Sequence, residues 1–187
     1  MKRRHADERL EHGRPLKSTV EIDVPADEVW AVIAEPGSLA HYHPFCAATE
    51  VERWPGTGSR DSITYYSGIR YQRNFVAWHE GVGYDIELGR PPNQTARVLW
   101  RIEPTSPRTC RLSIEVVPLL KSDLSDEKKR AYQERLFGEV LQHYLGCVVA
   151  GVKFFATTGK AVIKDQFGTN PLYSDQAQRG EKWDLYP

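Results

Sequence analysis

Hydrophobic and polar residues alternate from 18 to 24, which predicts a half-buried strand. Pro25 interrupts this pattern and suits the first turn of a helix, because its fixed φ angle is already helical. Apolar residues at 29–33 give that helix a buried side, and Pro36-Gly37 ends it. A second, shorter helix is predicted at 39–42.

A series of strand-like segments occupies the middle of the chain. Turn signals rich in glycine, proline, asparagine and serine separate them. The segments span 46–54, 59–66, 69–79, 84–90, 95–103 and 109–117. Short β segments at such regular spacing predict an antiparallel meander rather than alternating strands and helices.

The last strong pattern is a long amphipathic helix, which we expect to begin after Ser125 as N-cap and to reach about Thr157. Its first third is heavily charged and its last third is apolar on nearly all sides, so the later part should be the more deeply buried. Gly138, Gly146 and Gly151 lower helix stability. Each indicates either close approach of a neighbouring backbone or ligand, or a tolerated irregularity.

These elements predict one α+β domain: a curved antiparallel sheet of about seven strands around the long C-terminal helix, with two short helices. We place this domain at 17–160. Residues 1–16 are charged and without periodicity, which predicts a tail. Residues 161–187, rich in Gln, Asp, Gly and Pro, are interpreted as a loosely attached C-terminal extension, anchored at most through Trp183 and Tyr186, that covers the mouth of a cavity or builds an interface.

Composition narrows the function classes. The chain has 187 residues, with 25 Lys plus Arg and 25 Asp plus Glu, so its formal net charge is zero. Proteins that follow nucleic-acid phosphates carry a basic excess, so we expect no nucleic-acid partner. The three cysteines, Cys46, Cys110 and Cys147, are widely spaced among apolar neighbours and predict small buried hydrophobic residues rather than disulfides.

Targeting signals are also absent from the pattern. We read no apolar run as long enough to span a bilayer and no apolar stretch of a signal peptide near the N-terminus. The expectation is therefore a cytoplasmic protein without membrane insertion.

The order of strand, two short helices, six strands and a long helix resembles the START-like, or SRPBCC, superfamily. Three segments carry the resemblance: STVEIDVPADEVWAVIAEPGSLAHYHP, PGTGSRDSITYYSGIRYQRNFVAW and RIEPTSPRTCRLSIEVVP. The superfamily includes pollen-allergen-like ligand binders, polyketide cyclases and dehydratases, and lipid-transfer domains. The resemblance covers about 18–160 and implies a helix-grip fold with an elongated cavity for hydrophobic or amphipathic molecules.

Strand faces give the predicted ligand-binding residues. On 69–79 the odd-numbered positions are placed inward, and a slip of one residue would exchange the two faces. The resemblance puts Arg73 where the concave face often carries a charge. The residues predicted to bind the ligand are Tyr65, Tyr71, Arg73, Phe75, His79, Trp100, Leu112, Ile114, Tyr144 and Val148.

A buried arginine needs an anionic or carbonyl partner, because an unpaired buried charge is very costly. One hypothesis is therefore that Arg73 receives a carboxylate or enolate-like oxygen of the ligand. The alternative is an ion pair with a glutamate of the chain, or an arginine that faces outward. The sequence leaves both open.

Candidate catalytic groups are few. His79 and His143 could act as general acids or bases because imidazole titrates near neutral pH, although neither has a partner visible in the sequence. His41 and His43, near Cys46, are two positions apart, and on a helix such positions point away from each other, so we expect no metal site. No motif for a nucleotide or another cofactor is present, and none is expected.

Three functional interpretations remain open. The first is a non-catalytic binding or carrier domain for a small hydrophobic or amphipathic molecule. The second is a cyclase, aromatase or dehydratase that acts on a polyketide-like substrate in the same cavity. The third is a protein-interaction module that uses the outer face of the sheet or the tails, with an exposed apolar patch around Val76 and Trp78. A homodimer also stays open.

Overall fold

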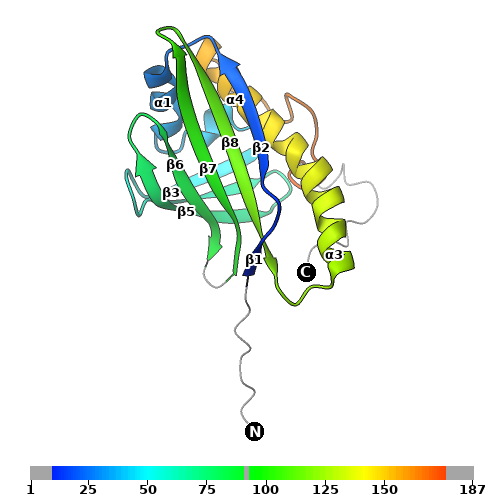
Figure 1. The fold of residues 1–187 in the computed structure, drawn as a ribbon. Helices are drawn as coiled ribbons and strands as arrows, with labels where there is room; N and C mark the ends of the chain where they lie inside the picture. Colours follow the sequence, from blue (N-terminus) through cyan, green and yellow to red (C-terminus); the bar gives the residue numbers. More distant parts are fainter. Residues whose placement is uncertain (1–9, 91–92, 176–187) are drawn as a thin grey trace.

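A computed structural model describes residues 10–90 and 93–175 of the chain (Figure 1). The strands are β1 (Leu10–His12), β2 (Leu16–Ile22), β3 (Cys46–Arg53), β4 (Arg60–Tyr65), β5 (Arg70–His79), β6 (Gly83–Arg90), β7 (Asn93–Ser106) and β8 (Thr109–Lys121). The helical segments are α1 (Ala26–Ala34), α2 (Leu39–Tyr42), α3 (Asp126–Ala131), η1 (Tyr132–Leu141) and α4 (Gln142–Thr158). The predicted elements are therefore present.

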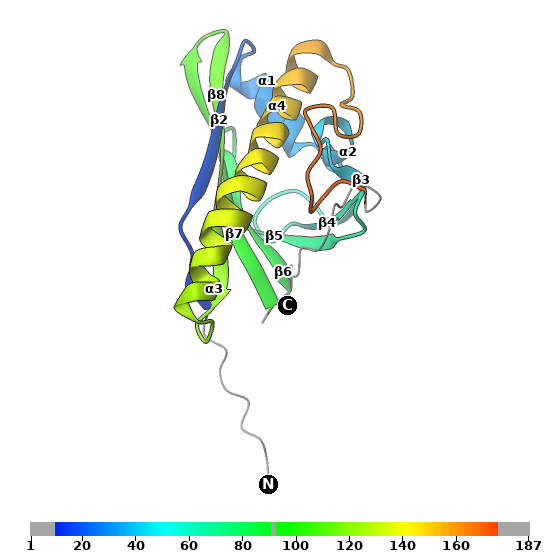
Figure 2. The same ribbon diagram turned by 90° about the vertical axis from the view of Figure 1, so that its right-hand side faces the viewer.

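The strands form an antiparallel sheet in the order β1-β8-β7-β6-β5-β4-β3, and β2 also pairs with β8. Figure 2 shows how the sheet curves: β3, β4 and β5 run across the direction of β7 and β8, and the long helix lies on the concave side. The predicted α+β helix-grip fold is thus confirmed. β1 lies within the segment that the sequence predicted to be a tail, and residues 1–9 of that segment lie outside the described residues.

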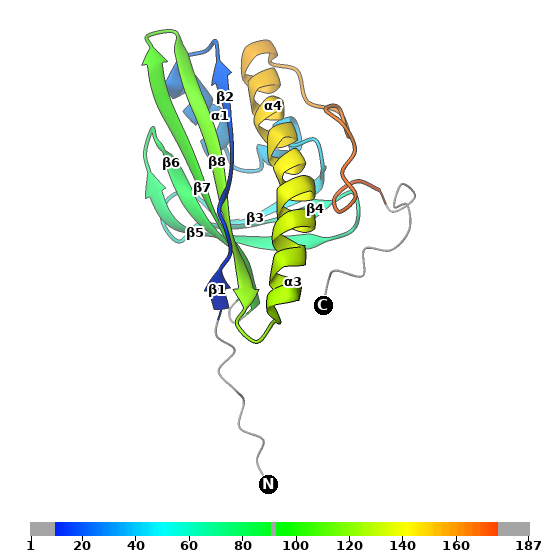
Figure 3. The ribbon, with the colours of Figure 1, turned by 45° about the vertical axis from the view of Figure 1, so that its right-hand side comes forward.

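The long helix consists of α3, η1 and α4 in direct succession (Figure 3). Ser125 caps its start, since its Oγ accepts a hydrogen bond from the backbone N–H of Lys128 at 3.3 Å. Gly159, with φ of 67°, ends it in the left-handed conformation that glycine adopts without strain. The π-helical geometry of η1 was not predicted, and such turns within α-helices often accompany functional sites.

Of the three helix glycines, Gly151 is the one that lies close to a neighbouring element, whereas a Cβ atom at Gly138 would meet the carbonyl oxygen of Gln133 in its own helical stretch at 3.3 Å. A Cβ atom at Gly151 would lie 2.0 Å from the carbonyl oxygen of Tyr42, so glycine lets α4 pack directly on the end of α2. A Cβ atom at Gly146 would meet nothing within 4 Å. The close-approach interpretation therefore applies to Gly151 and not to Gly146.

Strand β5 changes its inward face part of the way along. Tyr71, Arg73 and Phe75 face the concave side as predicted, but a β-bulge lies between Phe75 and Ala77. A bulge adds a residue to one strand, so the alternation shifts by one position beyond it. Trp78 consequently packs inward against Tyr84, Trp30 and Trp54, and His79 is exposed. The predicted inward position of His79 is wrong.

The helical stretch Asp126–Thr158 contains an 18-residue window with a mean hydropathy of 1.3, long and apolar enough to cross a membrane by length and composition. The expectation that no run meets this criterion was therefore wrong. In the fold the same stretch lies on the concave face of the sheet, where its apolar side is buried. The core helix of a globular protein meets the criterion equally well.

The segment 159–175 leaves the end of α4 and runs back beside α2 towards the end of β4 (Figures 2 and 3). Backbone hydrogen bonds fix it at His41, Pro44 and Ser67, with donor–acceptor distances of 2.8, 3.0 and 3.1 Å. The expectation of a loosely attached extension is therefore wrong for its described part, because these hydrogen bonds join it to the domain along its length. Residues 176–187 lie outside the described part of the chain.

Candidate functional site

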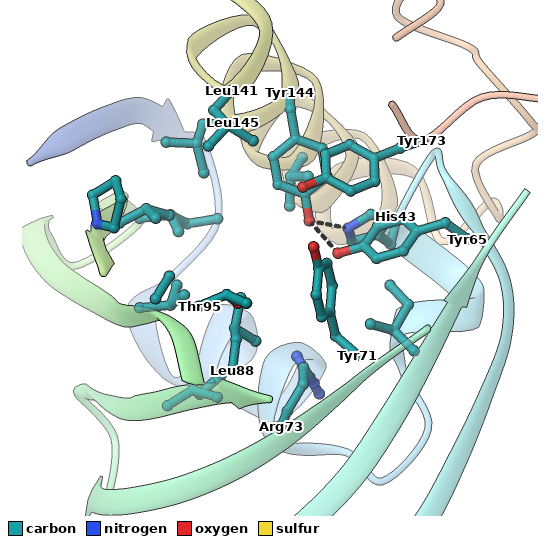
Figure 4. A pocket seen from close by; sticks show the side chains of 18 of the residues that line it. His43, Tyr65, Tyr71, Arg73, Leu88, Thr95, Leu141, Tyr144, Leu145 and Tyr173 are labelled. Atoms are coloured by element: carbon teal, nitrogen blue, oxygen red, sulfur yellow. Dashed lines mark hydrogen bonds between the residues drawn. The ribbon is translucent and has the colours of Figure 1, made fainter. Parts of the chain in front are cut away.

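A cavity lies between the concave face of the sheet and the helical segment η1–α4 (Figure 4). Its volume is about 100 Å³. Aliphatic and aromatic side chains form most of its wall, and the polar side chains gather at one end, apart from Thr95, which lies near Leu88 at the other end (Figure 4). This arrangement is typical of sites for small molecules, in which apolar walls supply affinity and a few polar groups set the orientation.

The predicted ligand-binding residues divide into three groups by position. Seven of them line the cavity: Tyr65, Tyr71, Arg73, Trp100, Ile114, Tyr144 and Val148. Phe75 and Leu112 are buried in the core outside the cavity lining. The tenth, His79, is exposed and does not line the cavity, and the same holds for His143, the other predicted catalytic histidine.

A hydrogen-bonded chain of three side chains forms the polar end. Nε2 of His43 lies 3.0 Å from Oη of Tyr144, and that oxygen lies 3.0 Å from Oη of Tyr65. The backbone N–H of Phe45 donates to Nδ1 of His43 at 3.3 Å. Figure 4 shows the hydroxyl groups of Tyr65, Tyr71 and Tyr144 pointing toward one another beside the ring of His43.

Local structure explains how these groups meet. His43 follows the last residue of α2, Tyr65 ends β4, and Tyr144 is in the first turn of α4. The close packing of α2 against α4 at Gly151 brings the first and third of these elements together. All three rings are consequently within 6.2 Å of one another, measured between centroids.

Burial keeps this chain of side chains uncharged. Desolvation, with a smaller contribution from the positive charge of Arg73, lowers the pKa of His43 to about 3. Desolvation raises the pKa of Tyr65 well above its ordinary value and also raises the pKa of Tyr144. At neutral pH the polar end therefore presents a neutral imidazole and neutral phenols.

Arg73 has a partner within the chain. Its Nε donates to Oδ1 of Asp61 at 2.6 Å, and its Nη2 donates to Oδ2 at 2.5 Å, which makes a bidentate pair. The two residues face each other across β4 and β5, and only 9% of the arginine side chain and 1% of the aspartate side chain are exposed. Burial opposes the charge on Arg73, but the carboxylate of Asp61 outweighs that effect and raises its pKa. The structure therefore has the expected internal ion pair of Arg73, but the expectation of a glutamate partner was wrong, because the residue opposite Arg73 on β4 is Asp61.

The segment 159–175 contributes a residue to the cavity wall. The ring of Tyr173 lies between those of Tyr65 and Tyr144, with centroid distances of 4.3 and 4.5 Å. Asn170, which is buried, holds the segment in place: its Nδ2 donates to the carbonyl of Val140 at 2.9 Å. The extension therefore completes the polar end of the site.

Sequence reasoning missed both His43 and Tyr173. The sequence suggested His43 only in connection with a metal site, because its position just after a short helix does not show which way its side chain points. Tyr173 lies in a segment without hydrophobic periodicity, and only its flanking apolar residue Leu172 hinted at burial. The apolar residues Pro44, Phe45 and Cys46 follow His43 directly, and they were the signal in the sequence that this histidine is buried.

The described residues contain no close group of three or more His, Cys, Asp and Glu side chains that could hold a metal ion. The three cysteines are free and buried, and burial raises the pKa of Cys147 to about 11. A thiol with so high a pKa is a weak nucleophile at neutral pH. His143 lies beside this thiol, 3.7 Å from it through Nε2, and outside the cavity.

Comparison with solved structures supports the fold. The chain is similar to norcoclaurine synthase from Thalictrum flavum in complex with dopamine and hydroxybenzaldehyde, with a TM-score of 0.59, 13% identity, and coverage of 81% of this chain and 90% of that one. It is similar to the Zhui aromatase/cyclase from Streptomyces sp. R1128, with a TM-score of 0.58, 16% identity, and coverage of 77% and 93%. For a START superfamily protein from Mycobacterium smegmatis the values are 0.56, 11%, 80% and 100%. No curated protein matches the sequence.

At these identities the structures indicate the fold alone. The family evidence comes from a family model, described as polyketide cyclase/dehydrase and lipid transport, which matches residues 15–143. This match covers most of the chain, and the helix-grip fold agrees with it. Family and fold together indicate a ligand-binding or polyketide cyclase-type role. The chain belongs to the polyketide cyclase/dehydrase and lipid transport family of the START-like superfamily.

Proposed function

We propose that this protein binds a small hydrophobic or amphipathic molecule in the cavity between the sheet and α4, as a binding or carrier domain of the cytoplasm. The single observation that carries the proposal is the division of the cavity into apolar walls and one polar end. Such a division suits a ligand with an apolar body and one polar end. The similar fold of norcoclaurine synthase is seen in complex with dopamine and hydroxybenzaldehyde, which are small aromatic molecules with polar groups, and this is consistent with such a ligand.

Binding is favoured over catalysis by the protonation states of the site. An efficient general acid or base has a pKa near the working pH. His43, Tyr65 and Tyr144 all have pKa values shifted away from neutrality, as expected for groups that offer fixed hydrogen bonds. The exposed histidines, His79 and His143, do not reach the cavity.

A polyketide cyclase-type reaction is the alternative, because the chain of His43, Tyr144 and Tyr65 could relay a proton to a bound substrate. Its test is to incubate the protein with a linear 1,3,5-triketone and to follow the absorbance of an aromatic product. Faster product formation than in buffer, reduced in Tyr144→Phe, would favour catalysis. Binding of the triketone without product would favour the carrier role.

A protein-interaction role has less support. Trp78 packs against Trp30 and Trp54, so the expected outer patch is reduced to Val76. Isolated exposed apolar residues are normal on protein surfaces.

The binding proposal can be tested by filling the cavity. Ala96→Phe places a ring into the apolar part of the cavity, and Val76→Phe places the same ring on the outside of the sheet. Native mass spectrometry of freshly purified protein and thermal shift against a library of small hydrophobic compounds give the readout. We expect ligand binding in the natural protein and in Val76→Phe, and its loss in a folded Ala96→Phe. Absence of any ligand or shift in the natural protein would contradict the proposal.

A further inference from the structure

One charged side chain faces the cavity. Among the described residues that line it, Arg73 is the one with a formal charge at neutral pH. Burial keeps His43, Tyr65 and Tyr144 uncharged, and the other lining side chains are aliphatic or aromatic apart from Thr95. The charge of a ligand that this cavity accepts therefore depends on what Arg73 can still balance.

Asp61 reaches this arginine from behind the cavity wall. It does not line the cavity, and 1% of its side chain is exposed. Its two carboxylate oxygens accept hydrogen bonds from Nε and Nη2 of Arg73 across the paired strands β4 and β5. Bidentate pairing adds a fixed geometry to the charge-assisted hydrogen bonds, so the guanidinium is held in one orientation.

The pair has no charged neighbour that would alter its balance. None of the other ion pairs between described residues includes Arg73 or Asp61. The ring of Phe75 packs on the guanidinium, with its centroid 5.2 Å from Cζ of Arg73. One positive and one negative charge are thus enclosed together, and their sum is zero.

A charged ligand would upset this balance. An anion in the cavity would place two negative groups, the ligand and Asp61, against the single positive charge of Arg73. A cation would leave one positive charge in excess. In either case one charge would be buried without a counter-charge, which is strongly unfavourable. An uncharged ligand leaves the balance as it is.

We propose that Asp61 sets the charge specificity of the cavity: it neutralises Arg73 from behind the wall and so restricts the ligand to uncharged molecules. Asp61 acts through Arg73 and is therefore a positioning residue. This inference rests on the proposed binding function and adds the charge class of the ligand and the residue that determines it.

Four probes of about one ring test the inference, because apolar cavities of about 150 Å³ take benzene and the volume here is about 100 Å³. Benzamide, benzoate and benzamidinium have nearly the same shape, and at pH 7 they are neutral, anionic and cationic. Ethylbenzene has no polar group and serves as the apolar reference.

In the natural protein we expect benzamide to bind at least about tenfold more tightly than benzoate or benzamidinium. Isothermal titration of the full chain at pH 7 gives these affinities. Benzoate or benzamidinium bound as tightly as benzamide would overturn the inference.

Asp61→Asn leaves the charge of Arg73 without its counter-charge, so an anionic ligand should now be favoured. The ratio of benzoate affinity to benzamide affinity should rise by about tenfold or more, because a hydrogen bond to a charged group is worth at least that factor. If Asp61 only stabilised the fold, both affinities would fall together and their ratio would stay unchanged. An unchanged ratio would therefore overturn the inference.

Two further variants serve as controls. Asp61→Glu keeps a carboxylate at this position and should keep the preference of the natural protein for benzamide. Asp85→Asn removes a carboxylate that pairs with arginines on the outer face, and it should leave the ratio of the two affinities unchanged. A ratio that rises in Asp85→Asn as much as in Asp61→Asn would contradict a specific role of Asp61.

Should Asp61→Asn not fold alone, its refolding from urea is followed with benzoate and with benzamide. Benzoate supplies the missing negative charge, so it should restore folding where benzamide does not. Equal recovery with the two compounds, or recovery with neither, would overturn the inference.

Ethylbenzene and benzamide separate the two proposals. If they bind the natural protein but the charge of the probe makes no difference, the inference about Asp61 fails alone. If none of the four probes binds the natural protein, the proposed binding function fails with it.

Discussion

The two ends of the cavity are built differently. The polar end combines the Arg73–Asp61 pair, the hydrogen-bonded chain from His43 to Tyr65, and a segment fixed by backbone hydrogen bonds. At the other end, side chains such as Leu88 and Leu141 form a mainly apolar wall, with Thr95 as a polar residue beside them (Figure 4). Directional bonds hold one geometry, whereas apolar contacts tolerate rearrangement. The polar end is therefore preorganised, and the apolar end beside η1 is the one that can yield to a ligand.

The largest effect on this contrast is expected from Asp61→Asn, which leaves the buried charge of Arg73 without its ionic partner. Breaking a buried pair in this way costs about 3–5 kcal/mol. Asp85→Asn is the matched control, since its partners Arg97 and Arg101 lie on the outer face with 48% and 35% of their side chains exposed. We expect Asp85→Asn to lower the free energy of unfolding by about 1 kcal/mol, because ion pairs with exposed partners contribute little to stability. Urea unfolding measures the free energy of unfolding of each variant. Equal losses in the two variants would contradict a special role of the buried pair at the polar end.

The buried histidine should make the polar end sensitive to acid. The pKa of His43 is about 3 in the folded protein, below its ordinary value of 6.5, so the unfolded chain binds the extra proton first. Its contribution to stability is complete above pH 6.5 and is lost as pH falls towards 3. Between pH 7 and pH 4 we expect a loss of about 3 kcal/mol from this group.

The measurement is urea unfolding at several pH values for the natural protein and for His43→Gln, which has no imidazole at this position. Between pH 7 and pH 4, the free energy of unfolding should fall by about 3 kcal/mol less in His43→Gln than in the natural protein. His79→Gln, at an exposed histidine outside the cavity, is the control and should keep the slope of the natural protein. A slope unchanged in His43→Gln would count against a neutral buried histidine.

An intermediate effect is expected from Asn170→Ala, which removes the hydrogen bonds to the carbonyl of Val140 and from the N–H of Leu172. Leaving these buried groups unsatisfied costs about 2 kcal/mol. Hydrogen exchange should show faster exchange in 159–175, and ligand affinity should fall because Tyr173 loses its position. Thr169→Ala, at an exposed neighbour, should change neither quantity. Unaltered exchange in Asn170→Ala would mean that other contacts fix the segment.

The smallest effect on stability is expected at the apolar end. Leu141→Ala removes a partly buried side chain of η1 and should cost about 1 kcal/mol, less than a fully buried leucine. The rate of ethylbenzene association, measured by stopped-flow fluorescence, should rise because the variant widens this end. Leu99→Ala on the outer face of the sheet should leave the rate unchanged. A rate that rises equally in both variants would place the entrance elsewhere.

Much of the fold could be predicted because its elements have clear periods and turn signals. The inward positions of Tyr71 and Arg73 followed from alternation together with the family resemblance, which placed a charged residue on the concave face at Arg73. Alternation cannot reveal a bulge, and the extra residue after Phe75 moved His79 to the surface. Side-chain pattern carries no mark of a bulge when both faces of a strand are amphipathic.

The partner of Arg73 could have been found from the sequence. The Ser67-Gly68 turn joins β4 and β5, and Asp61 and Arg73 are equally far from Ser67, so an antiparallel hairpin puts them opposite each other. His43 and Tyr173 could not be placed in this way. Their partners are distant in sequence and meet them only through packing of whole elements, which no local pattern encodes.

The position of Tyr173 bears on how such a domain is delimited in the laboratory. A shortened gene that stops at the end of α4 would retain every described strand and helix, and its product could fold well. One side of the binding site would nevertheless be missing, and the phenol rings of Tyr65 and Tyr144 would face water instead of a third aromatic ring. Affinities measured on that fragment would describe a site that lacks one of its aromatic walls.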